Sequence, residues 1–391
     1  MDTFFQFYLP TRIVVGSPGW LADAAVELES FQGRRAGVVT DAVIRGLASF
    51  QALGPVLAEA GIEWAATFDN VPPDSDVDVV EAVSRTFQEA GCDMLVAVGG
   101  GSVIDTAKAV NIVLTAGGDL RDYQGVQVLT APLFPLVVIP TTVGTGSEVT
   151  SIAVVLDKQD DRKLTFVDKH LTPTLALLDP AVTFTLPVTM VAATAMDALT
   201  HAVEAFVDVE HSPFSDMYAV EASRRIRSRL LTALNPEDNQ EARAELQWAS
   251  TLAGVAFNHS MVGVVHALAH SLGSVARVPH GVANYLMLVE GLRCNADEVP
   301  DRIVEFAVKT GFVAAESPDV DVNTAIAAIE SFRDEVGRKA GLPTNLTGAG
   351  VRPDQIPALV EKASEDGSLV YNPRYVSEEE LQEMYERRMG D

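Results

Sequence analysis

Short runs of apolar, often β-branched residues alternate with helical patterns along the first half of the chain. The runs predict strands at residues 12–16, 36–41, 64–68, 94–98 and 136–139. Between them, apolar residues recur at spacings of three and four, which predicts helices around 50–60, over 77–90 and over 103–116. The run 94–98 is apolar at every position, as expected of a central parallel strand that is covered on both faces. This alternation predicts an α/β domain with a Rossmann-like, doubly wound parallel sheet.

The pattern changes after Pro187. Before that residue, apolar runs at 152–156 and 164–167 flank a polar turn and predict a hairpin, and 175–178 predicts one more strand. From Met190 onward helical periodicity dominates, interrupted by Gly and Pro. With 391 residues, the chain is also longer than a typical single domain with one hydrophobic core. We therefore predict two domains, an α/β domain at 1–185 and an all-α domain at 186–391.

Composition and charge exclude several functional classes. The chain has 54 acidic and 28 basic residues and a formal net charge of −26, which disfavours binding to nucleic acid or to an anionic membrane surface. The N-terminus lacks the basic start and apolar run of a secretory signal, and no apolar stretch approaches about 20 residues. Cys92 and Cys294 are far apart and predict buried thiols, not a disulfide framework. We expect a cytoplasmic protein with no membrane segment.

One aspartate and four of the seven histidines form a pattern typical of a metal site. Asp197 and His201 are four residues apart in an Ala-rich segment without Gly or Pro, so they share one helix face. His266 and His270 repeat this spacing, and His280 stands at a predicted loop-to-helix entry. Any one of these histidines alone could be a core residue or a helix cap, but the combination favours one divalent metal site. Spacing alone does not distinguish His266 from His270.

A glycine loop follows the most apolar strand. Gly99, Gly100, Gly101 and Ser102 precede a predicted helix, where backbone N–H groups and the helix N-terminus favour a pyrophosphate. The match to the GxGxxG pattern is poor, and a tight turn is the alternative interpretation. A second loop of Gly and small hydroxyl residues, 140–147, follows the next strand. The ends of neighbouring parallel strands form the crevice where such sheets bind ligands, so the two loops together predict a dinucleotide site.

Asp41 ends an earlier predicted strand. A carboxylate at this place accepts hydrogen bonds from the ribose hydroxyls of NAD and repels the 2′-phosphate of NADP. The alternative interpretation is a helix N-cap. We expect NAD as the cofactor, with NADP less favoured.

Five segments resemble the motifs of the iron-containing (group III) NAD(P)-dependent alcohol dehydrogenases, and the likeness extends over nearly the whole chain. They are GGGSVIDTAK at 99–108, PTTVGTGSEVT at 140–150, AMDALTHAVE at 195–204, HALAHSLG at 266–273 and PHGVAN at 279–284. Two departures from the family pattern are Asp74, where relatives often carry Asn, and Ser271, which replaces a commoner Pro.

The resemblance assigns roles to individual residues. It implies that Asp197, His201, His266 and His280 bind one divalent ion, Fe(II) or alternatively Zn(II). It places His270 beside the nicotinamide as a catalytic residue, and Phe257 in the substrate pocket. It also implies cofactor contacts from the following set: Asp41, Asp74, Gly99, Gly100, Gly101, Ser102, Asp105, Thr141, Thr142, Thr145, Thr150, Lys163 and His270.

The expected activity is hydride transfer between a short primary alcohol or diol and NAD(H), with the metal activating the oxygen and His270 relaying the proton. One alternative is a metal- and NAD-dependent lyase similar to dehydroquinate synthase, although such an enzyme should show several basic pocket residues. A non-catalytic protein that inherited the scaffold is a second alternative, against which the filled ligand positions speak. By the same resemblance we expect a homo-oligomer.

Overall fold

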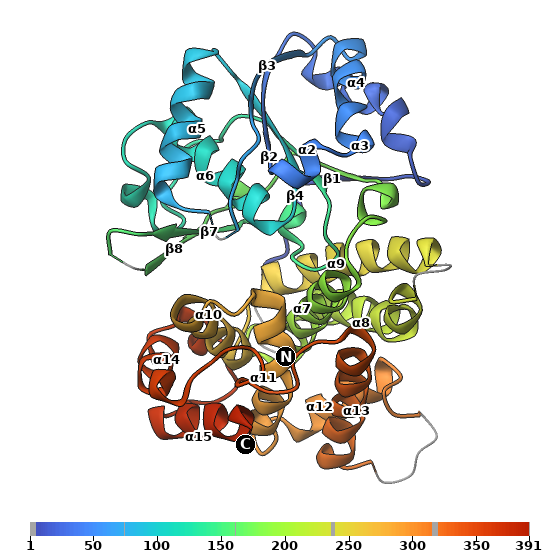
Figure 1. Ribbon diagram of the computed structural model, residues 1–391, viewed down its shortest axis with the longest axis vertical. Coiled ribbons are helices and arrows are strands. Elements are labelled where there is room, and N and C mark those ends of the chain that lie inside the picture. The colour runs from blue at the N-terminus through green and yellow to red at the C-terminus, as the bar shows by residue number, and fades with distance from the viewer. Residues whose placement is uncertain (1–4, 74, 161, 236–238, 315–319, 391) are drawn as a thin grey trace. The chain divides into compact units, whose positions relative to one another are not determined.

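The computed structural model describes residues 5–73, 75–160, 162–235, 239–314 and 320–390. The described chain forms two compact units. One, here called the α/β unit, comprises residues 9–142 and 146–185. The other, the helical unit, runs from Leu186 onward and includes Val143–Thr145 and the N-terminal segment up to Tyr8. Figure 1 shows the strands of the first unit in blue to green and the helices of the second in green to red.

The α/β unit is built on a six-stranded parallel sheet, which confirms the predicted Rossmann-like fold. Its strands follow the order β1-β9-β6-β4-β2-β3. Every predicted strand of this sheet is present, within one residue or so at each end. The strands are β1 (Arg12–Val15), β2 (Arg35–Thr40), β3 (Glu63–Phe68), β4 (Met94–Gly99), β6 (Leu136–Pro140) and β9 (Leu175–Leu178).

Helices cover both faces of this sheet because successive strand residues point to opposite sides. On one side Val38 and Val96 pack with residues from a series of short helices, and on the other Val39 and Leu95 pack with the two longer helices. The longer helices are α5 (Val77–Glu89) and α6 (Gly101–Ala116). The short helices are η1 (Trp20–Asp23), α1 (Ala25–Leu28), η2 (Glu29–Phe31), α2 (Ala42–Arg45), α3 (Ala48–Gln51) and α4 (Leu53–Glu59). The single helix predicted around 50–60 is therefore two helices, α3 and α4.

The strand order reverses between β2 and β4. The chain passes from β2 to its neighbour β3, and then returns through α5 to β4 on the other side of β2. Open α/β sheets bind ligands beside such a reversal, at the carboxyl ends of the strands. Asp41 follows β2 and Gly100 follows β4, so both residues lie at this position.

A smaller sheet completes the α/β unit. The predicted hairpin is confirmed, because β7 (Ile152–Asp157) pairs antiparallel with β8 (Arg162–Val167). The short strand β5 (Gly125–Val126), which was not predicted, adds to β8 in parallel. Connecting 3-10 turns are η3 (Leu120–Tyr123), η4 (Ser147–Val149), η5 (Lys169–Leu171) and η6 (Pro180–Thr183).

The helical unit surrounds α7 (Val188–Val207), which packs against helices on several sides. Although α7 is long and apolar enough to cross a membrane, 89% of its apolar window is buried inside the protein, as in the core helix of a soluble protein. The remaining elements are α8 (Pro213–Ala233), α9 (Gln240–Ser260), α10 (Val264–Ala276), α11 (His280–Asn295), α12 (Pro300–Lys309), α13 (Val322–Ala340), η7 (Pro353–Gln355), α14 (Ile356–Ser364), η8 (Gly367–Val370) and α15 (Glu378–Met389). The prediction of an all-α second half is confirmed.

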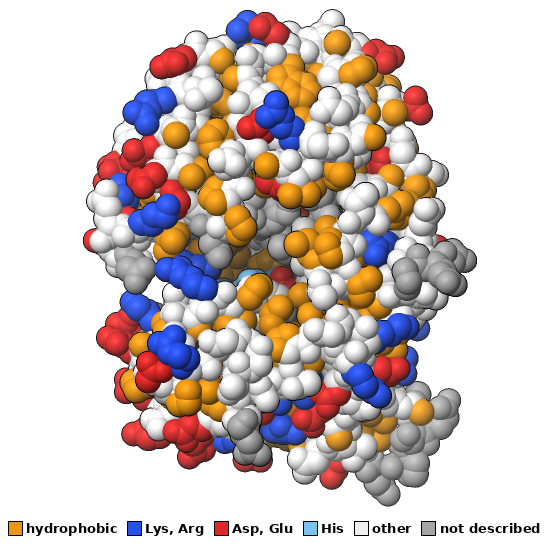
Figure 2. Space-filling view, viewed as in Figure 1, with side chains coloured by type: hydrophobic (Ala, Val, Ile, Leu, Met, Phe, Trp, Pro, Cys, Tyr) orange, Lys and Arg blue, Asp and Glu red, His pale blue; other side chains and the backbone are white. Residues whose placement is uncertain are grey.

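Charged side chains of both signs are interspersed over the face drawn in Figure 2. Among the described residues on this face, the blue Lys and Arg side chains form no extended patch. The described residues of this face therefore offer no extended basic surface to a polyanion.

Candidate functional site

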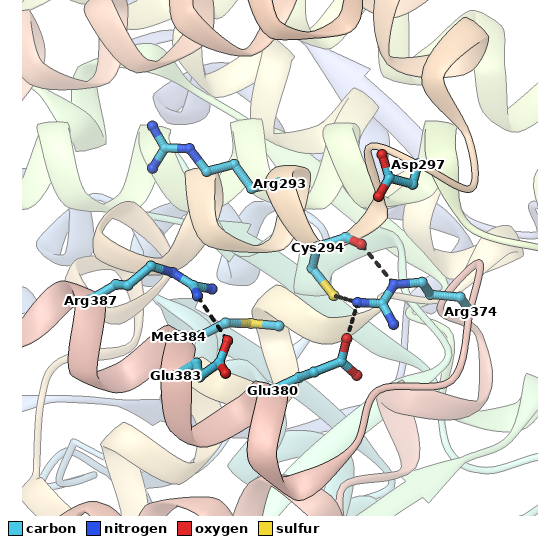
Figure 3. Close-up of a pocket in the computed structure, with 8 residues that line it drawn as sticks. All are labelled: Arg293, Cys294, Asp297, Arg374, Glu380, Glu383, Met384 and Arg387. Atoms are coloured by element: carbon cyan, nitrogen blue, oxygen red, sulfur yellow. Dashed lines mark hydrogen bonds and ion pairs between the residues drawn. The ribbon is translucent and has the colours of Figure 1, made fainter.

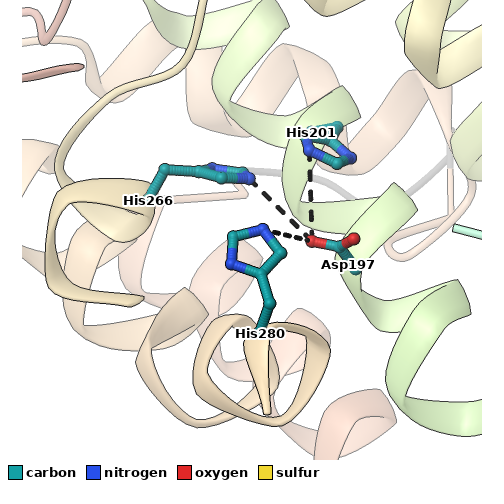
Figure 4. A group of neighbouring side chains, drawn as sticks. All are labelled: Asp197, His201, His266 and His280. Carbon is teal, nitrogen blue, oxygen red and sulfur yellow. Dashed lines mark ion pairs between the residues drawn. The ribbon is translucent and has the colours of Figure 1, made fainter. Parts of the chain in front are cut away.

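Four side chains from three helices of the helical unit converge on one point (Figure 4). Asp197 and His201 lie one turn apart on α7, His266 lies in the first turn of α10, and His280 is the first residue of α11. One ligand-type atom from each of the four lies within 4.8 Å of all the others. The structure thus brings together all four residues to which the sequence analysis assigned metal binding.

The separations between these atoms suit a cation placed among them. Oδ1 of Asp197 is 4.0 Å from Nε2 of His201, 3.9 Å from Nε2 of His266 and 3.4 Å from Nε2 of His280. With metal–ligand bonds of about 2.1 Å, the ligands of a tetrahedral ion lie about 3.4 Å apart. One carboxylate and three imidazoles also form a donor set that Fe(II) or Zn(II) accepts.

A glycine allows His280 to approach the helix that carries Asp197. Gly281, the second residue of α11, lies so close to α7 that a Cβ atom on it would be 2.5 Å from the carbonyl oxygen of Ala193. Any larger residue would push the start of α11 away from α7. The glycine that follows His280 in the sequence motif therefore has a packing role in the site.

The electrostatics of the cluster also fit a divalent ion. Burial raises the pKa of Asp197 to about 7. Burial and the neighbouring His266 hold the pKa of His201 well below its usual range, and burial with the neighbouring His270 does the same for His266. Neutral imidazoles are the form that binds a metal, and a cation beside Asp197 would favour its ionised form. The four residues therefore match the chemistry of the implied ion.

Two further residues, which the sequence analysis did not single out, hold these side chains in place. Glu204 accepts a hydrogen bond at Oε2 from Nδ1 of His266, at 2.5 Å, and another at Oε1 from the backbone of Val265, at 2.6 Å. With its proton on Nδ1, His266 presents the lone pair of Nε2 to the centre of the cluster. Asn284 donates from Nδ2 to Oδ1 of Asp197, at 2.6 Å. Both carry a sequence signal, since Glu204 lies two turns after Asp197 on α7 and Asn284 one turn after His280 on α11.

His270 stands beside the cluster but does not belong to the four. Its Nδ1 bonds Oδ2 of Asp366 at 2.8 Å, and its ring stacks on that of His280 with centroids 5.4 Å apart. Phe257 of α9 stacks on His201 with centroids 4.2 Å apart. Lining of the substrate pocket by Phe257 remains a prediction. Asp366 carries no sequence signal, because it lies far along the chain in a loop.

Ser271, the departure from the family pattern, is directed into the protein. Its hydroxyl lies 2.5 Å from the Tyr385 hydroxyl on α15 and donates to the carbonyl of Leu268 at 2.9 Å. Tyr385 is completely buried. The expected effect of Ser271 on the substrate pocket remains untested, and the contact seen here ties α10 to α15.

The predicted glycine loop joins β4 to the 16-residue helix α6. Gly100 is the residue before the helix, and Gly101 and Ser102 are its first two residues. The backbone of Thr141 donates to Gly99 at 3.0 Å, which joins this loop to the one after β6. A Cβ on Gly100 would lie 2.8 Å from Cγ2 of Thr142, so the close approach of the two loops requires a glycine here. The N-terminus of α6 thus has the form of a phosphate site.

Asp41 caps the short helix α2. Its Oδ1 accepts hydrogen bonds from the backbone of Val43 at 2.8 Å and of Ile44 at 2.9 Å. The N-cap alternative is therefore confirmed. Because both of these bonds use Oδ1, Oδ2 remains for a ribose hydroxyl, and that contact remains a prediction.

Asp105 and Lys108 bond α6 to η4 and to the segment that follows it, up to the start of β7. Asp105 accepts from Ser147 Oγ at 3.0 Å and from the Val154 backbone at 3.1 Å. Nζ of Lys108 donates to the Thr150 carbonyl and hydroxyl at 2.8 and 3.0 Å and to the Ile152 carbonyl at 2.7 Å. Both oxygens of Asp105 thus bond the protein itself, which gives this residue a role in ordering the loop.

The remaining predicted cofactor residues have the following places. Lys163 lies in β8 opposite Leu156. Thr145 belongs to the short segment that groups with the helical unit. Asp74 lies outside the described residues. Contact of these residues with a dinucleotide remains a prediction.

A surface pocket of about 540 Å³ in the helical unit contains none of the predicted site residues (Figure 3). Three arginines and three acidic residues line it together with Cys294 and Met384. Each guanidinium group is in an ion pair, Arg293 with Glu330, Arg374 with Glu380 and Arg387 with Glu290. The arginines are therefore already neutralised, and the pocket does not have the character of an anion site. Cys294 and the buried Cys92 are both free thiols.

Comparison with known proteins identifies the family. The model "Iron-containing alcohol dehydrogenase" matches residues 10–180, and the model "Fe-containing alcohol dehydrogenase family, C-terminal" matches residues 191–389. The NAD-dependent methanol dehydrogenase of Bacillus methanolicus is 34% identical over 96% of this chain and 97% of its own length. The 1,3-propanediol dehydrogenase of Klebsiella pneumoniae is 35% identical over 96% of both chains.

The fold of a solved relative agrees with these matches. A crystal structure of 1,3-propanediol oxidoreductase superposes with a TM-score of 0.92 and 33% identity, covering 99% of this chain and 100% of that one. Matches in sequence and in fold thus extend over both units and include every segment that contributes to the cluster. The chain belongs to the iron-containing alcohol dehydrogenase family.

Proposed function

We propose that this oxidoreductase interconverts short primary alcohols or diols and the corresponding aldehydes, with NAD as hydride carrier and one divalent metal ion, Fe(II) in preference to Zn(II). The observation that carries the proposal is the convergence of Asp197, His201, His266 and His280 within 4.8 Å of one another. The family membership of the chain supplies the class of reaction.

The four residues of the cluster would hold the ion, and Glu204 and Asn284 would orient His266 and Asp197 for that purpose. A bound divalent ion supplies a Lewis acid that lowers the pKa of an alcohol hydroxyl or polarises an aldehyde carbonyl. Because Asp197 and His266 are nearly completely buried, water has little access to their ligand atoms.

His270 is the proposed proton acceptor. Oxidation of an alcohol to an aldehyde moves a hydride from carbon to NAD⁺ and releases one proton from the hydroxyl. The side chain of His270 is 29% exposed, whereas that of His266 is 2% exposed, so His270 can exchange a proton with solvent. The same residue would return a proton when an aldehyde is reduced.

The α/β unit is the proposed site of the dinucleotide. The N–H groups at the start of α6 suit the pyrophosphate, and the close approach of Thr142 to Gly100 gives that loop a fixed shape. Oδ2 of Asp41 would accept from the ribose hydroxyls, and the negative charge would disfavour NADP. Among relatives, the Bacillus methanolicus enzyme is named as NAD-dependent.

The substrate class rests on the relatives and on one residue. The two relatives compared above act on methanol and 1,3-propanediol by their names. Phe257, which stacks on His201, would form an apolar wall of the substrate pocket and restrict the size of the substrate. We also propose that the enzyme is cytoplasmic and works as a homo-oligomer.

The test is a panel of alcohols, diols and aldehydes with NAD and NADP, using anaerobically purified protein loaded with Fe(II) or Zn(II). Net accumulation of NADH with propanol, butanol or 1,3-propanediol is the expected result. A lyase of the dehydroquinate synthase kind would return its cofactor to the starting state in each cycle and accumulate no NADH. Lack of turnover with every alcohol and aldehyde would contradict the proposal.

A further inference from the structure

The two histidines of α10 have the same kind of partner. Nδ1 of His266 bonds the Glu204 carboxylate, and Nδ1 of His270 bonds the Asp366 carboxylate at 2.8 Å. A carboxylate oxygen accepts, so in each pair the imidazole carries its hydrogen on Nδ1 and leaves the lone pair on Nε2. For His266 this lone pair belongs to the cluster of four. For His270 it would be available to a group outside the protein.

Asp366 is itself held in place. It is the N-cap of η8, where Oδ1 accepts from the backbone of Ser368 at 2.9 Å, while Oδ2 bonds His270. The residue is therefore an acceptor whose two oxygens have different, fixed partners.

The ring of His270 is constrained on two other sides. It stacks on His280 with an interplanar angle of 13°, and it meets the edge of His266 with centroids 5.9 Å apart. These contacts restrict the plane of the ring, but they leave open which nitrogen faces which way. A 180° flip about the Cβ–Cγ bond would exchange the two edges of the ring. Only a directional hydrogen bond selects one of the two orientations.

We propose that Asp366 is a positioning residue for the dehydrogenase reaction: it fixes the orientation and tautomer of His270 so that Nε2, without a hydrogen, faces the reacting alcohol. This inference rests on the proposed function. In the forward direction the O–H bond of the alcohol breaks and an N–H bond forms at Nε2 of His270, while the hydride goes to NAD⁺. The Asp366 carboxylate keeps the Nδ1 hydrogen and does not exchange it in this step.

The variant Asp366→Asn tests this role with little change of shape. If the amide oxygen keeps the bond to the backbone of Ser368, the NH₂ group faces Nδ1 of His270 and forces the hydrogen onto Nε2. The cap survives, but the tautomer is the wrong one for accepting a proton. We expect kcat to fall by at least about 10- to 100-fold, the loss typical when the hydrogen-bond partner of a metal-ligating histidine is removed. Metal content and the dissociation constant of NADH should not change.

Two comparisons separate positioning from a structural effect. Glu365→Ala removes the exposed carboxylate next in the chain and should leave kcat and stability unchanged. In a double-mutant cycle, adding Asp366→Asn to His270→Ala should cause no further loss of kcat, because Asp366 acts through His270. The proposal would be overturned if the kcat loss of the double mutant equalled the product of the two single losses. It would also be overturned if Asp366→Asn kept the kcat of the wild type.

A spectroscopic measurement tests the inference without relying on turnover. Long-range ¹⁵N–¹H spectra of the seven imidazoles in the Zn(II)-loaded protein, with His270 assigned by the His270→Ala variant, report its tautomer. The expected result is hydrogen on Nδ1 in the wild type and on Nε2 in Asp366→Asn. Hydrogen on Nε2 in the wild type would refute the inference. If the wild type oxidised no alcohol, the proposed function would fail while this spectrum still decided the role of Asp366.

Discussion

Oδ1 of Asp197 and Nε2 of His280 lie 3.4 Å apart, although the two residues belong to different helices. Gly281 makes this approach possible by bringing the start of α11 against the backbone of α7. Burial raises the pKa of Asp197 to about 7, and a cation bound beside this carboxylate would stabilise its ionised form. The short distance between these two atoms allows one metal ion to bind both residues.

Substitution of the two histidines of α10 should have different effects. His266→Ala removes one of the four converging ligand atoms, so we expect the purified protein to lose most of its metal. His270→Ala should keep its metal and lose about 100-fold or more in kcat, since a general acid–base residue commonly contributes that much. Elemental analysis and steady-state kinetics of both variants measure the difference. An empty site in His270→Ala would reverse the two roles.

Metal affinity should depend on pH through Asp197. In the metal-free protein the carboxyl is protonated below pH of about 7 and must lose its proton before it binds a cation. His201 and His266, whose pKa values are held low, are already neutral there and do not compete. The apparent affinity for Zn(II) should therefore fall by about tenfold or more for each pH unit well below 7 and level off above it. Calorimetric titration across this range tests the slope, and an affinity that rises on acidification would speak against it.

Asp41 should decide between NAD and NADP. In Asp41→Ser a hydroxyl can keep the cap of α2 while the negative charge is lost. We expect KM for NADP to fall and KM for NAD to rise, with kcat little changed, because the repulsion of the 2′-phosphate is removed. Asp69→Ser, which removes a carboxylate from the ion pair with Arg45, is a control for loss of charge in the same unit. Unchanged cofactor preference in Asp41→Ser would mean that its carboxylate serves only as a cap.

Lys108 should stabilise the α/β unit. In Lys108→Met the carbonyls of Thr150 and Ile152 lose a buried donor, which should cost about 2–4 kcal/mol of unfolding free energy. The exposed Lys169→Met offers a matched control with an expected change within about 0.5 kcal/mol. Urea denaturation of both variants measures the difference. A stability of Lys108→Met equal to that of the wild type would show that water satisfies these carbonyls.

The main elements of the fold could be predicted because their patterns are local. The strand Met94–Gly99 is apolar throughout, and its burial on both faces follows directly from that. The Ala-rich segment around Asp197 and His201 likewise specifies a buried helix. The break of the predicted helix near 50–60 into α3 and α4 has a local cause in Pro55, because a proline has no N–H to bond the carbonyl of Gln51 one turn earlier. The small strand β5, in contrast, depends on pairing with β8, which no local pattern contains.

The candidate site was predictable in part. Four-residue spacing placed Asp197 with His201 on one helix face, but it treated His266 and His270 alike. The structure separates them, because only His266 has a nitrogen among the converging atoms. Asp366 could not be found from the sequence, because its pairing with His270 joins a loop to a distant helix and neither residue's neighbours indicate the other.

The metal site is tested most directly by anomalous diffraction from anaerobically grown crystals supplied with Fe(II) or Zn(II). We expect one anomalous peak per chain, within about 2.0–2.2 Å of an oxygen of Asp197 and of one nitrogen each of His201, His266 and His280. Density for water alone among those four side chains, in crystals whose protein still oxidises alcohols, would contradict this expectation.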